Sequence, residues 1–143
     1  LYLLKSLNQL KTNNNISSTV VLHRSRSGLN AIQSFLGENG YDTQILLDSG
    51  EIDFERESIK ICTLSSVKGL EFDNVFIIDL NDDILPYPPG FNGEDDELHI
   101  STERRLLYTS MTRARERLYL LSSGEPSRYL TEIDEDLLVK ANN

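Results

Sequence analysis

The segment NVFIIDL at residues 74–80 constrains the fold most, because it is almost continuously apolar. A strand with one face in solvent alternates apolar and polar residues, whereas a strand buried on both faces reads as an unbroken apolar run. Strands of the second kind belong to parallel sheets that helices cover on both faces. The segment therefore predicts a central strand of an α/β fold.

The segments around this strand alternate between strand and helix patterns. Apolar residues at helical spacing predict helices over 1–11, 29–36 and 102–114, with a short helix expected within 127–138. Runs of β-branched and apolar residues predict strands over 19–23, 42–47, 59–64 and 117–122. We predict an α/β fold with an open, mostly parallel sheet flanked by helices.

The length of 143 residues suits one compact domain, and we expect residues 1–143 to form it. Residues 82–100 are expected to be an acidic, proline-rich excursion, and residues 123–143 a tail. The acidic patch NGEDDE at 92–97 is interpreted as a solvated loop. Because the chain does not begin with Met, we expect it to be a piece of a longer protein.

Composition excludes several function classes. The formal net charge is −9, and residues 41–100 alone carry three basic against fifteen acidic residues, which argues against a generic nucleic-acid coat. The single Cys62 excludes an internal disulfide framework and a cysteine metal cluster. Two histidines far apart in sequence give no zinc pattern, so no metal ligand is predicted. No apolar run approaches the roughly 20 residues that cross a bilayer, so we expect no membrane contact. The lone cysteine favours a reducing compartment, and we expect a cytoplasmic location.

Ligands of open α/β sheets bind beyond the carboxyl ends of the strands. The residues to consider are therefore Arg24 after the first strand, residues 63–71 after the third, and the helix that leads into the last strand. Neither a GxxxxGK[ST] nor a GxGxxG motif occurs in the chain. The chain by itself therefore lacks an obvious means of holding ATP and magnesium.

The segment TLSSVKGLEFDNVFIIDL at 63–80 joins two predicted strands through a Lys-Gly turn. Gly69 permits a tight turn that exposes backbone N–H groups. Glu71 lies on a short link between buried strands, so its direction is fixed. From spacing alone, a salt bridge to a nearby arginine is as good an interpretation of Glu71 as a binding role.

The segment ERRLLYTSMTRARERLYL at 103–120 combines arginines with an apolar helical stripe. At 100° per residue the buried stripe contains Leu107, Ser110, Met111 and Ala114. Arg105 lies opposite, in solvent, and Arg113 lies at the border of the stripe in the last helical turn, where the helix dipole favours a cation. Arg115 and Arg117 are expected to cap the helix carbonyls or to serve the surface. For Arg113, the pattern leaves open both a structural salt bridge and a role in a cleft.

Three stretches together resemble the second motor domain of superfamily 1 DNA helicases of the UvrD/Rep type. STVVLHRSRSGLNAIQSFL is similar to their motif IV, TLSSVKGLEFDNVFI to motif V and ERRLLYTSMTRARERLYL to motif VI. The resemblance spans about residues 19–122. It implies a RecA-like fold of the P-loop NTPase superfamily, without a phosphate loop of its own, and an active site shared between two such domains. An N-terminal motor domain would hold most of the ATP and Mg²⁺.

The resemblance also implies roles for seven residues. Arg24 and Arg113 look like the two catalytic arginines that reach the γ-phosphate from across the cleft. Glu71 looks like the acid that bonds the ribose hydroxyls, and Gly69 lends its backbone near the phosphates. The residues that resemble those facing single-stranded DNA are Thr63, Ser65 and Lys68.

The sequence departs from this family in two places. Ser65 stands where the family usually has His, and a hydroxyl can bond a phosphate but can neither stack nor carry charge. Only about 40 residues separate Arg24 from Thr63, where UvrD and Rep carry a bulky accessory domain. The parent is therefore interpreted as a pared-down member.

The resulting prediction is the C-terminal domain of an ATP-dependent DNA helicase or translocase, of the kind that serves DNA repair. Its expected partners are an N-terminal motor domain of the same protein and single-stranded or partly duplex DNA. The isolated chain is expected to be inactive. One alternative is an ATP-driven motor that acts on RNA polymerase or beside a nuclease domain. A second alternative is a non-catalytic interaction module whose acidic patch docks a basic partner.

Overall fold

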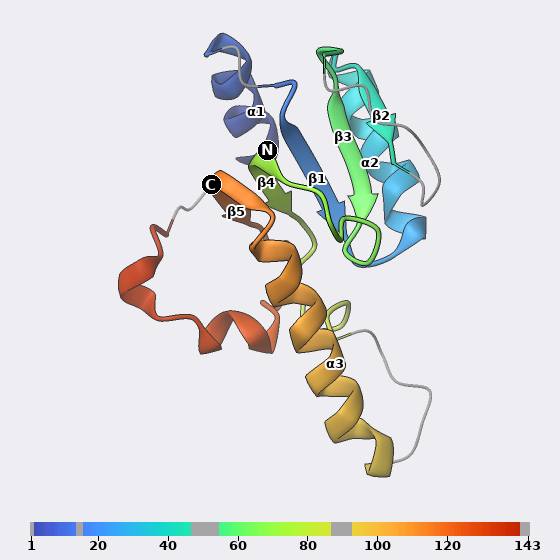
Figure 1. Ribbon diagram of the computed structural model, residues 1–143, viewed down its shortest axis with the longest axis vertical. Helices are drawn as coiled ribbons and strands as arrows, with labels where there is room; N and C mark the ends of the chain where they lie inside the picture. The colour runs from blue at the N-terminus through green and yellow to red at the C-terminus, as the bar shows by residue number, and fades with distance from the viewer. Residues whose placement is uncertain (1, 14–15, 47–54, 87–92, 141–143) are drawn as a thin grey trace.

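The computed structural model describes residues 2–13, 16–46, 55–86 and 93–140, with residues 93–96 described by their backbone alone. Within these ranges the predicted fold class is confirmed. Five strands pair in parallel to form one sheet in the order β2-β3-β1-β4-β5 (Figure 1). The strands are β1 (Thr19–His23), β2 (Thr43–Ile45), β3 (Ile59–Thr63), β4 (Phe72–Ile77) and β5 (Ala114–Leu120).

Among the described residues, three α-helices and two short 3-10 helices accompany the sheet: α1 (Tyr2–Thr12), α2 (Arg26–Glu38), α3 (Gly93–Met111), η1 (Arg128–Glu132) and η2 (Glu135–Leu137). Each of the predicted strands has a counterpart, and β1 has the predicted bounds. The apolar run at 74–80 contains most of β4, which lies between β1 and β5 and is buried at five of its six positions. Burial on both faces explains its unbroken apolar sequence.

Successive residues of the strands pack on opposite faces of the sheet. Val21, Ile61 and Phe76 face a cluster with α1 and α2. Val20, Cys62 and Val75 face a second cluster, which contains Leu107 of α3 and Tyr129 of the tail. The molecule therefore has three layers. The face of the sheet that carries the second cluster is covered by α3, by the tail and by the loop that follows β3.

Helix α3 differs from its prediction. It begins at Gly93 rather than near residue 102 and ends at Met111, so the part of the acidic patch over 93–97 is helical and not a loop; residue 92 and the prolines at 88 and 89 lie outside the described residues. The prolines that suggested an irregular excursion all precede residue 93, and no proline or glycine interrupts residues 94–111. No helix-breaking residue therefore interrupts α3 between Gly93 and its end at Met111.

The buried side of α3 carries Glu103, Leu107 and Ser110, one residue per turn. Leu107 and Ser110 belong to the predicted stripe, Leu106 and Met111 are half-buried, and Arg105 is exposed as predicted. Across the described residues, we find no helix with the length and apolar character that a bilayer span needs.

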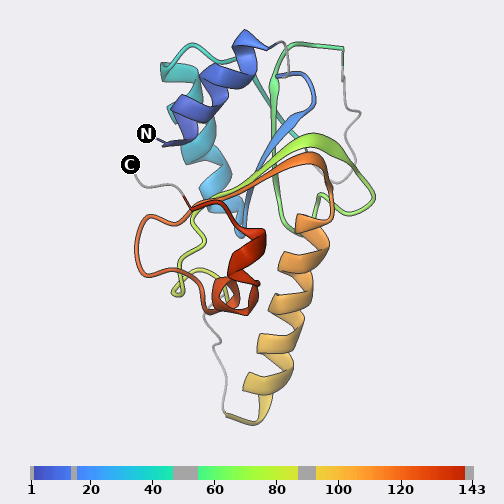
Figure 2. The same cartoon turned by 90° about the vertical axis from the view of Figure 1, so that its left-hand side faces the viewer.

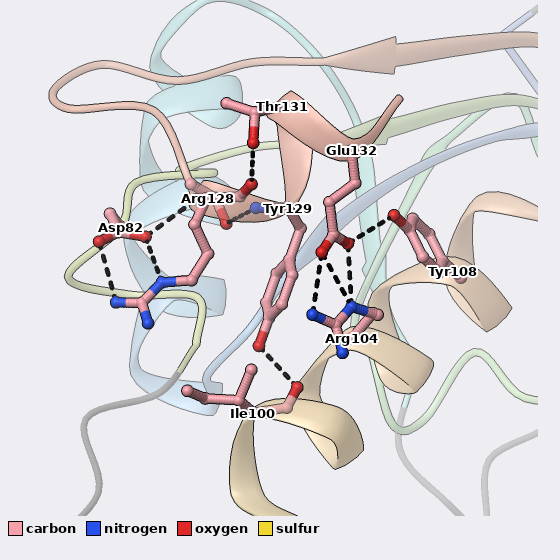
Figure 3. A network of polar contacts seen from close by, with 9 residues as sticks. Asp82, Ile100, Arg104, Tyr108, Arg128, Tyr129, Thr131 and Glu132 are labelled. Carbon is pink, nitrogen blue, oxygen red and sulfur yellow. Dashed lines mark hydrogen bonds and ion pairs between the residues drawn. The ribbon is translucent and has the colours of Figure 1, made fainter. Parts of the chain in front are cut away.

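The tail packs beside α3 (Figure 2). Arg104 of α3 forms a fork-like ion pair with Glu132, whose carboxylate also accepts a hydrogen bond from Tyr108. The Tyr129 hydroxyl donates to the carbonyl of Ile100 at 2.7 Å. Figure 3 shows these contacts between residues of α3 and residues of η1. They fix α3 against η1, and the Arg104 guanidinium holds the pKa of the Glu132 carboxyl below its ordinary value.

A second ion pair anchors the start of the tail. Arg128 donates from Nε to Asp82 at 2.9 Å, and its backbone N–H bonds the same carboxylate (Figure 3). These bonds lower the pKa of the Asp82 carboxyl. Residues 123–143 were predicted to be a tail. In the part that the structure describes, residues 123–132 are held to the domain by such contacts.

Candidate functional site: a pocket at the amino end of the sheet

Since all five strands are parallel, their first residues lie at one end of the sheet, which we call the amino end. An open pocket of about 530 Å³ lies there. Ser18 precedes β1, Arg113 precedes β5, and Arg115 lies near the start of β5. The link before β4 completes the lining with Gly69, Leu70 and Glu71.

The pocket is at the opposite end of the sheet from the one that the strand-end rule predicts. The reason is the connection between β3 and β4. Residues 64–71 return from the carboxyl end of β3 to the amino end of β4 without an intervening helix, and they pass over β1 in the strand order. Gly69 and Glu71 therefore follow β3 in sequence but lie where β4 begins.

Gly69 adopts a φ of +86°, which confirms that the Lys-Gly turn uses a conformation that favours glycine. An added Cβ at this position would meet no atom within 4 Å. The backbone there is consequently open, which suits the predicted approach of a ligand to the N–H groups of this turn.

Arg113 lies two residues beyond the end of α3, whereas the sequence placed it in the last helical turn. Its carbonyl accepts the N–H of Phe72 at 2.9 Å, which ties its backbone to the first residue of β4. Its Nη2 donates to the Thr112 hydroxyl at 3.1 Å. Its Nε is buried and has no hydrogen-bond partner among the described residues. A buried donor that lacks a partner costs free energy, so the Nε of Arg113 is a position where a water or a ligand atom can accept a hydrogen bond.

Glu71 is exposed in the same pocket and forms no ion pair with any residue that the structure describes. The salt-bridge interpretation of Glu71 is therefore not supported. An anionic carboxylate and an incompletely bonded guanidinium line one pocket without neutralising each other.

Arg24 is not part of this pocket. It follows β1 at the carboxyl end of the sheet, and the five residues of β1 separate the two ends by about 16 Å. Its guanidinium forms a fork with Glu103 of α3, at 2.8 Å and 3.0 Å. The Glu103 side chain is 4% exposed, so this pair is nearly dry. The structure thus brings together Gly69, Glu71 and Arg113, but not Arg24.

Of the predicted DNA-facing residues, Thr63 ends β3 and Ser65 follows it at the carboxyl end of the sheet, whereas Lys68 directly precedes Gly69 of the pocket. Ser65 and Lys68 are exposed, whereas Thr63 is buried. The Thr63 hydroxyl bonds the hydroxyls of Ser65 and Ser66, at 3.2 Å and 2.9 Å. Thr63 thus shapes the turn, and the two exposed side chains are available to a ligand.

Sequence reasoning missed a polar cluster beside these residues. His23 accepts the backbone N–H of Ser25 at Nδ1, so its Nε2 donates to Asp79 at 2.9 Å. Asp79 has a φ of +52°, unusual for a residue other than glycine. An Asp that ends a buried strand was the available signal, but its partner lies 56 residues away in sequence.

The comparisons with known proteins agree with the fold. A family model described as the UvrD-like helicase C-terminal domain matches residues 42–125, more than half of the chain. An ATP-dependent DNA helicase PcrA of Staphylococcus epidermidis is 36% identical over 108 residues, which cover 68% of this chain and 14% of that protein. The PcrA of Staphylococcus aureus strain MRSA252 is 35% identical over a segment of the same length. This chain therefore spans about one seventh of these relatives.

Among solved structures, the C-terminal domain of a possible DNA helicase from Lactobacillus plantarum WCFS1 superposes with a TM-score of 0.71 at 22% identity. The match covers 95% of this chain and 73% of that one. At this identity the likeness concerns the fold, which is the α/β arrangement described above.

Proposed function

Because the chain belongs to the UvrD-like helicase C-terminal domain family, we propose that it is the second motor domain of an ATP-dependent DNA helicase or translocase and forms one wall of a shared ATP site. The N-terminal motor domain of the full-length protein would hold the phosphates and Mg²⁺. In the described part of this chain, no group of three or more His, Cys, Asp or Glu residues could hold a metal ion.

The observation that carries the proposal concerns two residues of one pocket: the buried Nε of Arg113 and the carboxylate of Glu71, neither of which has a partner among the described residues. A nucleoside triphosphate has phosphate oxygens that accept from a guanidinium and ribose hydroxyls that donate to a carboxylate. The donor set of the pocket therefore fits ATP, with the N–H groups of the Gly69 turn available to phosphate oxygens.

ATP bound by the other domain supplies the phosphoryl group. In the proposed mechanism, Arg113 donates hydrogen bonds to phosphate oxygens and stabilises the charge that develops on them during hydrolysis. Glu71 orients the nucleotide through its sugar. Arg24 has no part in this step, because its guanidinium is already engaged with Glu103.

We propose that the DNA track follows the link after β3, which carries Ser65 and Lys68. Lys68 offers a positive charge and Ser65 a hydroxyl, and both can bond backbone phosphates without reading sequence. Thr63 would act by holding the turn. With Ser65 in place of a histidine, this track lacks a base-stacking ring, so its contribution to affinity rests on phosphate contacts.

The deciding experiment is Arg113→Ala in the full-length protein, with ATP turnover and thermal stability measured side by side. We expect kcat to fall about 10³-fold or more, as for other arginines that act across a cleft. Arg105→Ala is the matched control, because Arg105 is an exposed arginine outside the pocket on the neighbouring helix.

Unchanged turnover of a folded Arg113→Ala protein would instead support a non-catalytic module. The isolated chain is expected to hydrolyse ATP negligibly, since it has no phosphate loop. Robust turnover by the isolated chain would contradict the shared site. Tight binding to RNA polymerase with weak DNA binding would favour the alternative motor, to which the acidic residues 41–100 are suited.

A further inference from the structure

Arg115 is the second arginine of the pocket, and neither the helical pattern nor the motifs gave it a binding role. The sequence suggested that Arg115 caps the helix carbonyls or serves the surface; it lies on β5 and not at the helix end, so it does not cap α3. It lines the same pocket as Arg113 and Glu71. Its side chain is 51% exposed, so an incoming ligand can reach it.

The Arg115 guanidinium is held in one orientation by two neighbours. Nε donates to Asp73 at 2.9 Å, and Nη2 donates to the Ser18 hydroxyl at 3.3 Å. The Ser18 hydroxyl also accepts the backbone N–H of Asp73 at 2.9 Å. The three residues form a closed network across β4, β5 and the start of β1. An oriented guanidinium loses less side-chain entropy when it binds a ligand.

These contacts leave donors for a ligand. A guanidinium has five N–H donors, and the described residues accept from two of them, which leaves Nη1 without a partner among those residues. Glu71 lines the same pocket yet pairs with neither Arg113 nor Arg115. Separated charges of both signs suit a ligand that carries both anionic oxygens and hydroxyl donors.

We propose that Arg115 is a second phosphate-binding residue of this pocket, pre-oriented by Asp73 and Ser18, which holds the nucleoside polyphosphate before the reaction. The proposal rests on the function proposed above. It divides the work between two arginines. Arg115, already bonded, contributes to ground-state affinity, whereas Arg113, with its unpartnered nitrogen, contributes to the reaction itself.

The test uses the full-length protein with a fluorescent, non-hydrolysable ATP analogue. Arg115→Ala is expected to raise the Kd for the analogue about tenfold, the effect of losing one charge-assisted hydrogen bond, and to change kcat less than about twofold. Asp73→Asn weakens the ion pair that orients Arg115 and is expected to raise the Kd for the analogue about threefold. Arg115→Lys keeps the charge but not the fork, and its Kd should lie between those of the native protein and Arg115→Ala.

Arg117→Ala is the matched control. Arg117 lies on the same strand, is also half-exposed and pairs with Glu116, but it does not line the pocket. We expect its Kd to be that of the native protein. A Kd unchanged by both Arg115 variants, or a rise of equal size in Arg117→Ala, would overturn the inference and leave Arg115 as a surface ion pair.

Arg113→Ala, measured in parallel, separates this inference from the proposal beneath it. If Arg113→Ala lowers turnover and the Arg115 variants keep native affinity, only the role of Arg115 fails. If Arg113→Ala leaves turnover unchanged, the ATP site fails and the inference fails with it.

Discussion

At the carboxyl end of the sheet, Arg24 is bonded to Glu103 and His23 to Asp79. At the amino end, the Arg113 Nε and the Glu71 carboxylate have no such partner among the described residues. Both ends carry an arginine that the motifs favoured equally. The difference is that Arg24 is engaged in an ion pair within this chain, whereas Arg113 has a buried nitrogen without a partner among the described residues.

The contrast is between particular side chains, and not between the two ends of the sheet as a whole. Lys60, near the start of β3, is fully buried, and its ammonium donates to three backbone carbonyls at 2.8–3.1 Å. A satisfied group at the amino end is therefore structural as well. A polar group that can bind a ligand is therefore recognised by the hydrogen bonds that it lacks, and not by its position alone.

The largest expected effect on stability comes from removing Arg24. Arg24→Ala deprives a carboxylate that is 4% exposed of its guanidinium, and breaking a buried pair costs about 3 kcal/mol of unfolding free energy. Arg113→Ala should change the unfolding free energy by less than about 0.5 kcal/mol. Urea denaturation of the purified chain measures both.

The double variant Arg24→Met with Glu103→Leu should recover most of the lost stability, because apolar side chains replace both charges. Equal losses for Arg24→Ala and Arg113→Ala would break the comparison between the two arginines.

Two glycines test the same contrast in backbone packing. A Cβ on Gly28 of α2 would lie 2.4–2.5 Å from ring atoms of His23, whose ring is held by Ser25 and Asp79. Gly28→Ala should therefore cost about 2–3 kcal/mol of unfolding free energy. Gly69→Ala meets no neighbour and should cost about 1 kcal/mol, from its positive φ alone.

The denaturation midpoints of the two glycine variants show which substitution lowers the stability more. Gly37→Ala is the reference, because a Cβ at this position meets no atom within 4 Å. A larger loss for Gly69→Ala than for Gly28→Ala would show that the amino-end turn is the more tightly packed of the two.

The smallest effect is expected in acid, at the tail. The pKa values of Glu132 and Asp82 are lowered in the folded chain by Arg104 and Arg128, so the unfolded state binds more protons as the pH falls. Their stabilising contribution is complete above the ordinary carboxyl pKa of about 4 and is lost as the pH drops through the lower folded values. The effect is small because the side chains of both ion pairs are between a third and a half exposed.

Amide hydrogen exchange of residues 128–132, corrected for the intrinsic rate, should therefore increase below about pH 4, before the sheet exchanges. Glu132→Gln should raise the exchange of this segment already at neutral pH. Simultaneous loss of protection in β1 and η1 would mean that the tail opens only with the whole domain.

Much of the fold followed from the sequence. The strand over 19–23 has the predicted bounds, and the helix around Leu29–Leu36 extends over Arg26–Glu38. Such elements follow from local periodicity, because burial on one face or on two sets the spacing of apolar residues. The start of α3 was missed because proline and acidic residues before it suggested an irregular segment.

The candidate site was predictable only in part. The motifs selected Gly69, Glu71 and Arg113, which the structure gathers in one pocket, and also Arg24, which it places elsewhere. Arg115 was expected to cap the helix carbonyls or to serve the surface, although it lines the pocket. No local pattern distinguishes these arginines, since each lies next to the end of a strand.

The sequence by itself determined the alternation of strands and helices, the parallel sheet and the motifs that identify the family. Only the tertiary structure decided which end of the sheet each polar side chain reaches, since the loop at 64–71 carries Glu71 back across β1. It also decided which arginine is paired. Glu103 meets Arg24 across 79 residues of sequence, and such a contact is set by where α3 packs in the folded chain, whereas local spacing encodes only burial.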